Sequence, residues 1–130
     1  MIDTLNIGKF IYNTLSGDSS INCKVYPLVA DNDAKFPFII YRRANLDSAT
    51  SKDGVFEDNV DVEITVVSDK YSVGVELASQ IRNDFEKMSV IYDNMEIMDG
   101  DLNLATEEYS NNAYVQRMNF NFKVKNNFIE

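Results

Sequence analysis

The chain has 130 residues and carries 21 acidic against 12 basic side chains, a formal net charge of -9. This length predicts one globular domain covering residues 1–130 with a modest core. The acidic excess argues against binding of the nucleic-acid backbone as the main activity, because that binding depends on cations that displace counterions.

Histidine is absent, and Cys23 is the single cysteine. The usual histidine dyads, histidine metal sites and an internal disulfide are therefore excluded, and we expect no enzymatic activity, no metal site and no cofactor. Cys23 itself is expected to be a buried apolar side chain. The sequence contains no apolar run long enough to span a bilayer and no secretory signal pattern, so we expect a soluble protein made in the cytoplasm, with no membrane partner.

The first predicted helix begins at Asp3 or Thr4, either of which can cap it, and ends near Leu15. Apolar side chains at helical spacing form the face expected to cover the core: Ile7, Phe10, Ile11 and Leu15. Three further apolar side chains project away from that face: Ile2, Leu5 and Tyr12. They are either ordinary exposed hydrophobic residues or part of a contact between subunits.

Two strands are expected next, a short one over Cys23–Pro27 and a longer one over Phe36–Arg43. The following stretch, Asn45–Gly54, is rich in Ser, Asp, Asn and Thr and has almost no apolar content. It predicts a loop that is long for so small a domain, and long loops are usually functional or mobile.

Strict alternation of Val and Ile with polar residues predicts a strand with one buried face over Asn59–Val67. The period then changes to that of a helix, which is expected over Lys70–Met88 and starts at Ser68 or Asp69. Apolar residues that share one arc of this helix include Tyr71, Val75, Leu77, Ile81 and Phe85.

The segment Tyr92–Glu108 alternates again but is interrupted at Asp99–Asp101, where either a β-bulge or a hairpin turn fits. We favour one bulged strand. The last strand, Val115–Val124, alternates apolar residues with an outward polar set: Arg117, Asn119, Asn121 and Lys123. If this strand lies beside Asn59–Val67, its outward basic side chains face the outward Asp61 and Glu63.

The order helix, three strands, helix, two strands (α-β-β-β-α-β-β) predicts an α+β fold. We expect an antiparallel sheet of four to five strands with two helices on one face. The other face, which carries Asp61, Glu63, Asn119 and Asn121, is left to solvent or to a partner.

Several segments in this order resemble one family: Val25–Pro27, Phe36–Tyr41, the strand Val60–Val67 that leads into the helix Tyr71–Met88, and the final strand Val115–Val124. Together they are similar to the small tail-completion or tail-terminator proteins of long-tailed bacteriophages. The resemblance implies a structural virion protein, assembled in the host cytoplasm, that forms a homohexameric ring at the junction of tail and neck. Its partners are copies of itself, the tail tube protein and the head-side connector or stopper protein.

The resemblance also implies that DNA passes through the lumen of the ring without specific binding. As subunit-interface residues we expect Ile2, Leu5, Tyr12, Asp61, Glu63, Arg117 and Lys123. As residues that reach toward the lumen or the adjoining ring we expect Asp47, Ser48, Ser51, Lys52 and Asp53. Alternatives remain open: a neck subunit (head-tail connector), a small ligand-binding or regulatory α+β module, or a hydrolase that uses two carboxylates such as Asp58 and Asp61.

Overall fold

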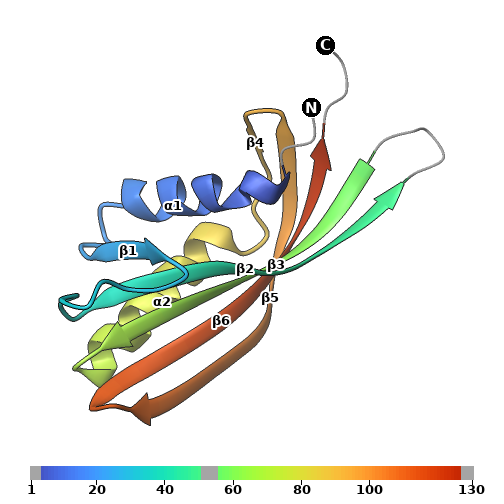
Figure 1. Cartoon of the computed structure of the whole chain (residues 1–130). Coiled ribbons are helices and arrows are strands. Elements are labelled where there is room, and N and C mark those ends of the chain that lie inside the picture. Colours follow the sequence, from blue (N-terminus) through green and yellow to red (C-terminus); the bar gives the residue numbers. More distant parts are fainter. Residues whose placement is uncertain (1–3, 51–55, 127–130) are drawn as a thin grey trace.

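The computed structural model describes residues 4–50 and 56–126 and arranges them as one curled sheet with both helices on the same face (Figure 1). In chain order the elements are a 3-10 helix Thr4–Asn6, α1 Ile7–Gly17, β1 Lys24–Pro27, β2 Phe38–Thr50, β3 Phe56–Ser68, α2 Tyr71–Phe85, β4 Val90–Tyr92, β5 Met95–Ser110 and β6 Ala113–Asn126. The strands follow the spatial order β1-β2-β3-β6-β5-β4. The α+β class and the single helical face are as predicted, but the sheet has six strands instead of four to five.

The additional strand is β4, which comes from the segment directly after α2. It pairs antiparallel with the start of β5, with Val90 opposite Ile97 and Tyr92 opposite Met95. Asp93, in the connecting turn, adopts a left-handed conformation with φ of 53°. We had expected one strand from Tyr92 onward; the Asp93-Asn94 turn divides this segment into a hairpin.

The expectation of a fully antiparallel sheet was wrong for the first two strands. β1 and β2 run parallel, with Lys24 beside Phe38 and Pro27 beside Tyr41. Leu28 is left-handed, with φ of 67°, and its N–H donates to the Tyr41 carbonyl at 2.9 Å. Because the two strands are parallel, residues 28–37 carry the chain from the end of β1 back to the level at which β1 begins. No tight hairpin joins the two strands.

The first helix begins later than predicted. Thr4 lies in the 3-10 helix and is buried, and its hydroxyl accepts a hydrogen bond from Asn126 Nδ2 at 2.6 Å instead of capping α1. Asp3, the other predicted cap, lies outside the described residues. The predicted core face of this helix is confirmed, since its four members are all buried: Ile7, Phe10, Ile11 and Leu15.

The second helix ends at Phe85, three residues before the predicted end at Met88. Lys87 adopts a left-handed conformation with φ of 58°, and its N–H donates to the Gly100 carbonyl at 2.5 Å. Gly100 lies in a register shift between Met98 and Asp101, which makes this part of β5 the bulge that we favoured over a hairpin turn. The bulge thus contacts the segment that follows α2.

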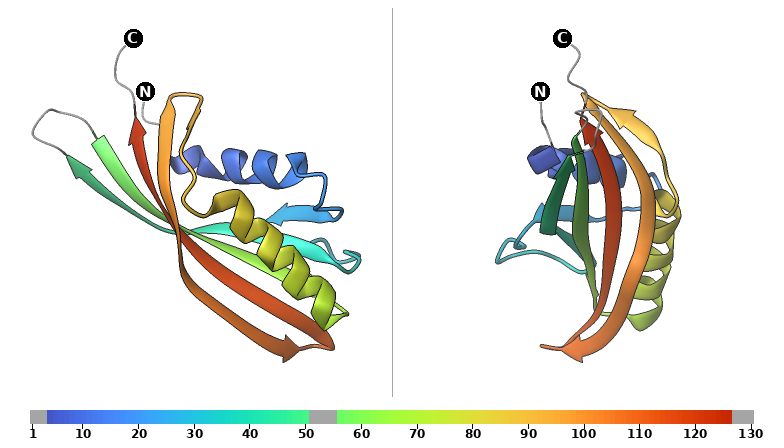
Figure 2. Two further views of the ribbon diagram at one scale, coloured as in Figure 1. Left: turned by 180° about the vertical axis from the view of Figure 1, so that it is seen from behind. Right: turned by 90° about the vertical axis from the view of Figure 1, so that its right-hand side faces the viewer.

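The segment Asn45–Gly54 is not a loop along its first part. Residues 45–50 continue β2 and pair with β3, from Asn45 opposite Asp61 to Thr50 opposite Phe56. These two strands form an arm, defined here as residues 45–50 and 56–60, that extends away from the helices (Figure 2). The polar composition misled the prediction because Leu46 is the one side chain of residues 45–48 that packs against the core, so this part of β2 shows no apolar alternation.

The core lies between the helices and the sheet. Phe85 of α2 packs edge-on against Phe10 of α1 and Phe122 of β6, with ring centroids 6.0 and 5.9 Å apart. Among the strands, β3 and β6 contribute most of the core side chains. Among the described residues, no helix is both long and apolar enough to cross a membrane.

Candidate subunit-contact surfaces

A groove with apolar walls lies between α1 and β2. It has a volume of about 270 Å³, and its lining includes Leu5, Gly8, Ile11, Leu28, Tyr41 and Arg43. Leu5 and Leu28 are 70% and 73% exposed, so the groove presents apolar side chains to the surface. Arg43 Nη1 donates to the Leu5 carbonyl at 2.7 Å, so one guanidinium group is fixed at the groove.

The apolar side chains predicted to project away from the core face of the first helix do so where they are described. Tyr12 is 43% exposed beside Leu5, whereas Ile2 lies outside the described residues. Burial raises the pKa of the Tyr41 hydroxyl in the groove wall, and the neighbouring Tyr12 raises it further. Leu5, Tyr12 and Tyr41 thus form one continuous surface.

The charged members of the predicted interface lie on the opposite face of the sheet from the helices: Asp61, Glu63, Arg117 and Lys123. The strands that carry them are neighbours, as that prediction requires, with Glu63 opposite Asn119 and Thr65 opposite Arg117. The apolar and charged members of the set therefore belong to two separate surfaces.

Three of these four charged side chains have partners within the subunit. Arg42 Nε donates to Glu63 at 3.2 Å, and Asn121 Nδ2 donates to Asp61 at 2.9 Å. Arg117 forms its ion pair with Glu108 of β5. The expected pairing of Arg117 and Lys123 with Asp61 and Glu63 is thus replaced by other partners from β2, β5 and β6.

The residues predicted to reach a lumen or an adjoining ring belong to the arm. Asp47 and Ser48 are exposed side chains of β2, opposite Asn59 and Asp58 of β3. Ser51, Lys52 and Asp53 lie outside the described residues. The described residues of the arm therefore form paired strands where the prediction placed a loop.

Sequence reasoning missed an aromatic and acidic cluster at the far end of the β5–β6 hairpin. The Tyr109 and Tyr114 rings lie 4.9 Å apart, and Tyr71 lies 5.7 Å from Tyr114. The Tyr71 hydroxyl donates to Glu107 at 2.9 Å, and Gln116 Nε2 donates to the same carboxylate at 2.9 Å. Both hydrogen bonds lower the pKa of Glu107, and the one from Gln116 has the larger effect.

Tyr71 was predicted to lie on the core face of α2, together with Val75, but both side chains are exposed. Helical periodicity alone placed them on that arc. α2 begins at Tyr71, so its first turn extends past the core toward the edge of the sheet at β5. For this cluster, the only signal in the sequence was that Tyr109 and Tyr114 lie near Glu107.

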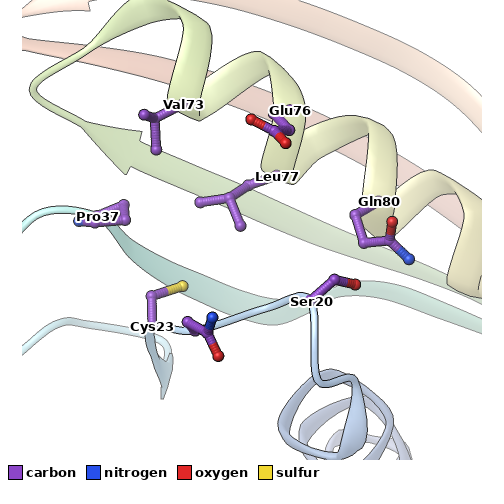
Figure 3. Close-up of a pocket in the computed structure, with 8 residues that line it drawn as sticks. Ser20, Cys23, Pro37, Val73, Glu76, Leu77 and Gln80 are labelled. Carbon is purple, nitrogen blue, oxygen red and sulfur yellow. The ribbon is translucent and has the colours of Figure 1, made fainter.

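A hollow of about 250 Å³ lies between α2 and the segments around β1. Figure 3 shows Val73, Leu77 and Gln80 of α2 on one side and Cys23 and Pro37 on the other. Cys23 is half-buried rather than fully buried, and desolvation raises the pKa of its thiol. The raised pKa disfavours the thiolate, which is the reactive form.

A carboxyl pair that sequence reasoning also missed joins the end of α1 to α2. The Asp18 carboxylate accepts hydrogen bonds from the Ser20 N–H at 2.9 Å and from Gln80 Nε2 at 3.1 Å. A hydrogen bond with Asp84 is the main reason why the pKa of Asp18 is lowered. Burial, followed by the proximity of Asp18, raises the pKa of Asp84 to about 7. Near neutral pH the pair therefore shares one proton.

The acidic pairs weighed from the sequence do not form such an arrangement. Asp58 is buried and accepts a hydrogen bond from Asn126 Nδ2 at 3.2 Å, whereas Asp61 accepts one from Asn121 Nδ2 at 2.9 Å. Within residues 4–50 and 56–126, no three His, Cys, Asp or Glu side chains gather as the ligands of a metal ion would.

Comparison with known proteins gives a likeness among solved structures. No protein-family model matches the chain, and no curated protein matches it. Among solved structures, a chain in the virion of a native gene transfer agent particle superposes with a TM-score of 0.70 at 14% sequence identity. The match covers 89% of this chain and 90% of that chain, so the two share a fold over nearly their whole length.

Proposed function

We propose that this protein is a structural subunit of a tailed-phage or phage-like virion and that it forms a ring at the junction of tail and head. The observation that carries the proposal is the fold shared with a gene transfer agent virion chain over about nine-tenths of both chains. A fold can serve many functions, so the assignment also draws on the surfaces described above.

Two different contact surfaces support a ring. The groove with Leu5 and Leu28 lies at the β1–β2 side of the sheet, and the cluster with Tyr109 and Glu107 lies at the β5 side. A head-to-tail contact joins two different surfaces of neighbouring copies, and repetition of such a contact about an axis closes a ring. One surface on each side of the sheet is the arrangement that this symmetry requires.

The charge of the protein supports the passage of DNA through such a ring. A net charge of -9 gives a predominantly negative potential, which disfavours adhesion of the phosphate backbone. In this proposal the ring is a homohexamer in the virion, it ends the polymerisation of the tail tube protein, and it receives the head-side connector. The role is structural and includes no catalytic step and no cofactor.

Removal of the gene from the phage tests this assignment. Tail termination predicts tails of uncontrolled length and heads without tails, and a plasmid copy of the gene restores normal particles. A neck subunit would instead leave detached tails of normal length. Normal infectious particles without this protein would overturn both assignments. Electron microscopy of tail lengths separates these outcomes.

A further inference from the structure

Within the described residues, β2 and β5 each have a long stretch of strand edge that the short outer strands β1 and β4 do not cover. On one side, β4 covers only Met95–Ile97 of β5, and in the described chain no strand pairs with the outer edge of residues 101–110. On the other side, β1 pairs with β2 only up to Tyr41, so in the described chain no strand pairs with the outer edge of residues 42–50. Unpaired edges expose backbone donors and acceptors that readily pair with another strand.

The two open stretches lie at opposite ends of the strands. Across the sheet, Arg42 is level with Glu63, Asn119 and Leu104, whereas Asp47 is level with Asn59, Lys123 and Met98. The open part of β5 therefore runs from the level of Asn45 toward the β5–β6 turn, and the open part of β2 runs from the level of Leu104 into the arm. β2 and β5 run in opposite directions, because three antiparallel pairings separate them.

We infer that residues 101–110 of β5 in one copy pair antiparallel with residues 42–50 of β2 in the next copy. The sheets of successive subunits then join into one closed, staggered barrel that lines the ring. A closed barrel requires such a stagger between strands, and edge-to-edge pairing supplies main-chain hydrogen bonds between copies. This inference rests on the proposed function, since it specifies the contact that builds the proposed ring.

Charge complementarity favours a second copy of this chain as the occupant of each edge. The open stretch of β5 carries acids and no base: Asp101, Glu107 and Glu108. The open stretch of β2 begins with Arg42 and Arg43. Full antiparallel overlap brings the Glu107–Glu108 end of one stretch against the Arg42–Arg43 end of the other.

The partners that these side chains have within the subunit do not prevent this contact. The ion pairs of Arg42 with Glu63 and of Arg117 with Glu108 are solvent-exposed, and exposed pairs are weak enough to be shared with a neighbour. The hydrogen bond from Arg43 to the Leu5 carbonyl and those that Glu107 accepts from Tyr71 and Gln116 are exposed as well. Leu104 and Tyr109, 58% and 61% exposed on β5, would lose water contact in the same joint. Burial of their apolar surface would add to the main-chain pairing.

Charge exchange tests the pairing. One variant carries Glu107→Lys and Glu108→Lys, and the other carries Arg42→Glu and Arg43→Glu. Each variant alone brings like charges together at every joint, so we expect its assembly to weaken by about tenfold or more. An equal mixture restores opposite charges at every joint if the two variants alternate, so we expect the ring to form again. Glu76→Lys, on the exposed side of α2, is the control for a change in net charge.

Sedimentation velocity measures assembly, and circular dichroism verifies the fold of each variant. Recovery of assembly on mixing supports the pairing. The pairing is overturned if the single variants assemble as wild type does, or if the folded variants fail to recover on mixing. In either case the ring would be built through another contact. A wild-type protein that never assembles contradicts the proposed function itself. Hydrogen exchange gives a second readout, from those amides of residues 101–110 that face away from β6. They should be protected in assembled wild type and not in the Arg42→Glu, Arg43→Glu variant, and equal exchange of these amides in both would contradict backbone pairing.

Discussion

Gly100 of β5 lies directly against the main chain of Phe85 at the end of α2. A Cβ atom at position 100 would come within 2.0 Å of the Phe85 carbonyl oxygen and within 3.0 Å of the Phe122 ring. The Lys87 N–H also donates to the Gly100 carbonyl at 2.5 Å. The β5 bulge and the end of α2 therefore depend on each other, and only glycine fits at their contact.

Substitution of Gly100 by Ala should lower the free energy of unfolding by about 2–4 kcal/mol, because the clash involves backbone that cannot move without breaking the end of α2. Gly17→Ala is the matched control, since a Cβ atom there meets nothing within 4 Å. Urea denaturation followed by circular dichroism compares the two. Equal stability of both variants would show that the bulge can relax.

A second prediction concerns the buried polar contact that joins the start of the chain to the end of β6. Asn126 Nδ2 donates to Thr4 Oγ1 at 2.6 Å and to Asp58 Oδ2 at 3.2 Å, and all three side chains are buried. Asn126→Ala should cost about 2–4 kcal/mol, because it removes a donor from the buried Asp58. The exposed Asn59→Ala is the control, and a similar urea midpoint for both would refute this role.

A third prediction concerns pH. The pKa of Asp84 is raised from its usual 3.8 to about 7, so between these values the folded protein holds a proton that the unfolded chain has released. Stability should therefore fall as pH rises from about 4 to 7, by about 1–2 kcal/mol once solvent screening of this partly exposed pair is allowed for. The lowered pKa of Asp18 acts in the other direction, and its contribution is lost only as pH falls below about 4.

Asp84→Asn isolates this effect, since the amide keeps a hydrogen-bond donor for Asp18 and does not titrate. The variant should lose the decline between pH 5 and pH 8 and should be more stable than wild type at pH 8. The control is Asp33→Asn in the exposed segment before β2. Urea titrations at the two pH values provide the test, and an unchanged slope in Asp84→Asn would assign the pH dependence to other groups.

A fourth prediction concerns the exposed flank of α1. Leu5→Asp together with Tyr12→Asp should give a folded protein that assembles at least about tenfold more weakly, because both side chains are exposed and contribute little to the core. Lys9→Asp, on an exposed position of the same helix, is the control. Light scattering coupled to size-exclusion chromatography reports the mass. Assembly equal to wild type would show that this flank faces water in the ring.

The sequence predicted those elements whose side chains repeat with the period of the structure. β3, β6 and the core face of α1 were identified because burial of one face imposes alternation or a helical stripe. The arm part of β2 was missed because Leu46 alone among residues 45–48 packs against the core, which is too little to impose an alternation. The parallel β1–β2 pair depends on the left-handed Leu28 and on the path of residues 28–37, which no local pattern reveals.

The contact surfaces were predicted less completely. Leu5 and Tyr12 were found because apolar side chains off the core stripe of a helix are visible in the sequence. The cluster of Tyr71, Tyr109 and Glu107 joins residues far apart in the chain, so only the fold brings it together. The same holds for Asp18 and Asp84, whose shared proton depends on how α1 ends beside α2.

The most direct test of the central claim, that copies of this chain close into a ring through unlike surfaces, is electron microscopy of the purified protein combined with native mass spectrometry. The account predicts a closed ring with cyclic symmetry and an open lumen, and a mass equal to a whole number of subunits, six in the proposed tail terminator. A protein that stays monomeric at every concentration, or that forms only a two-fold symmetric dimer joined by like surfaces, would contradict it.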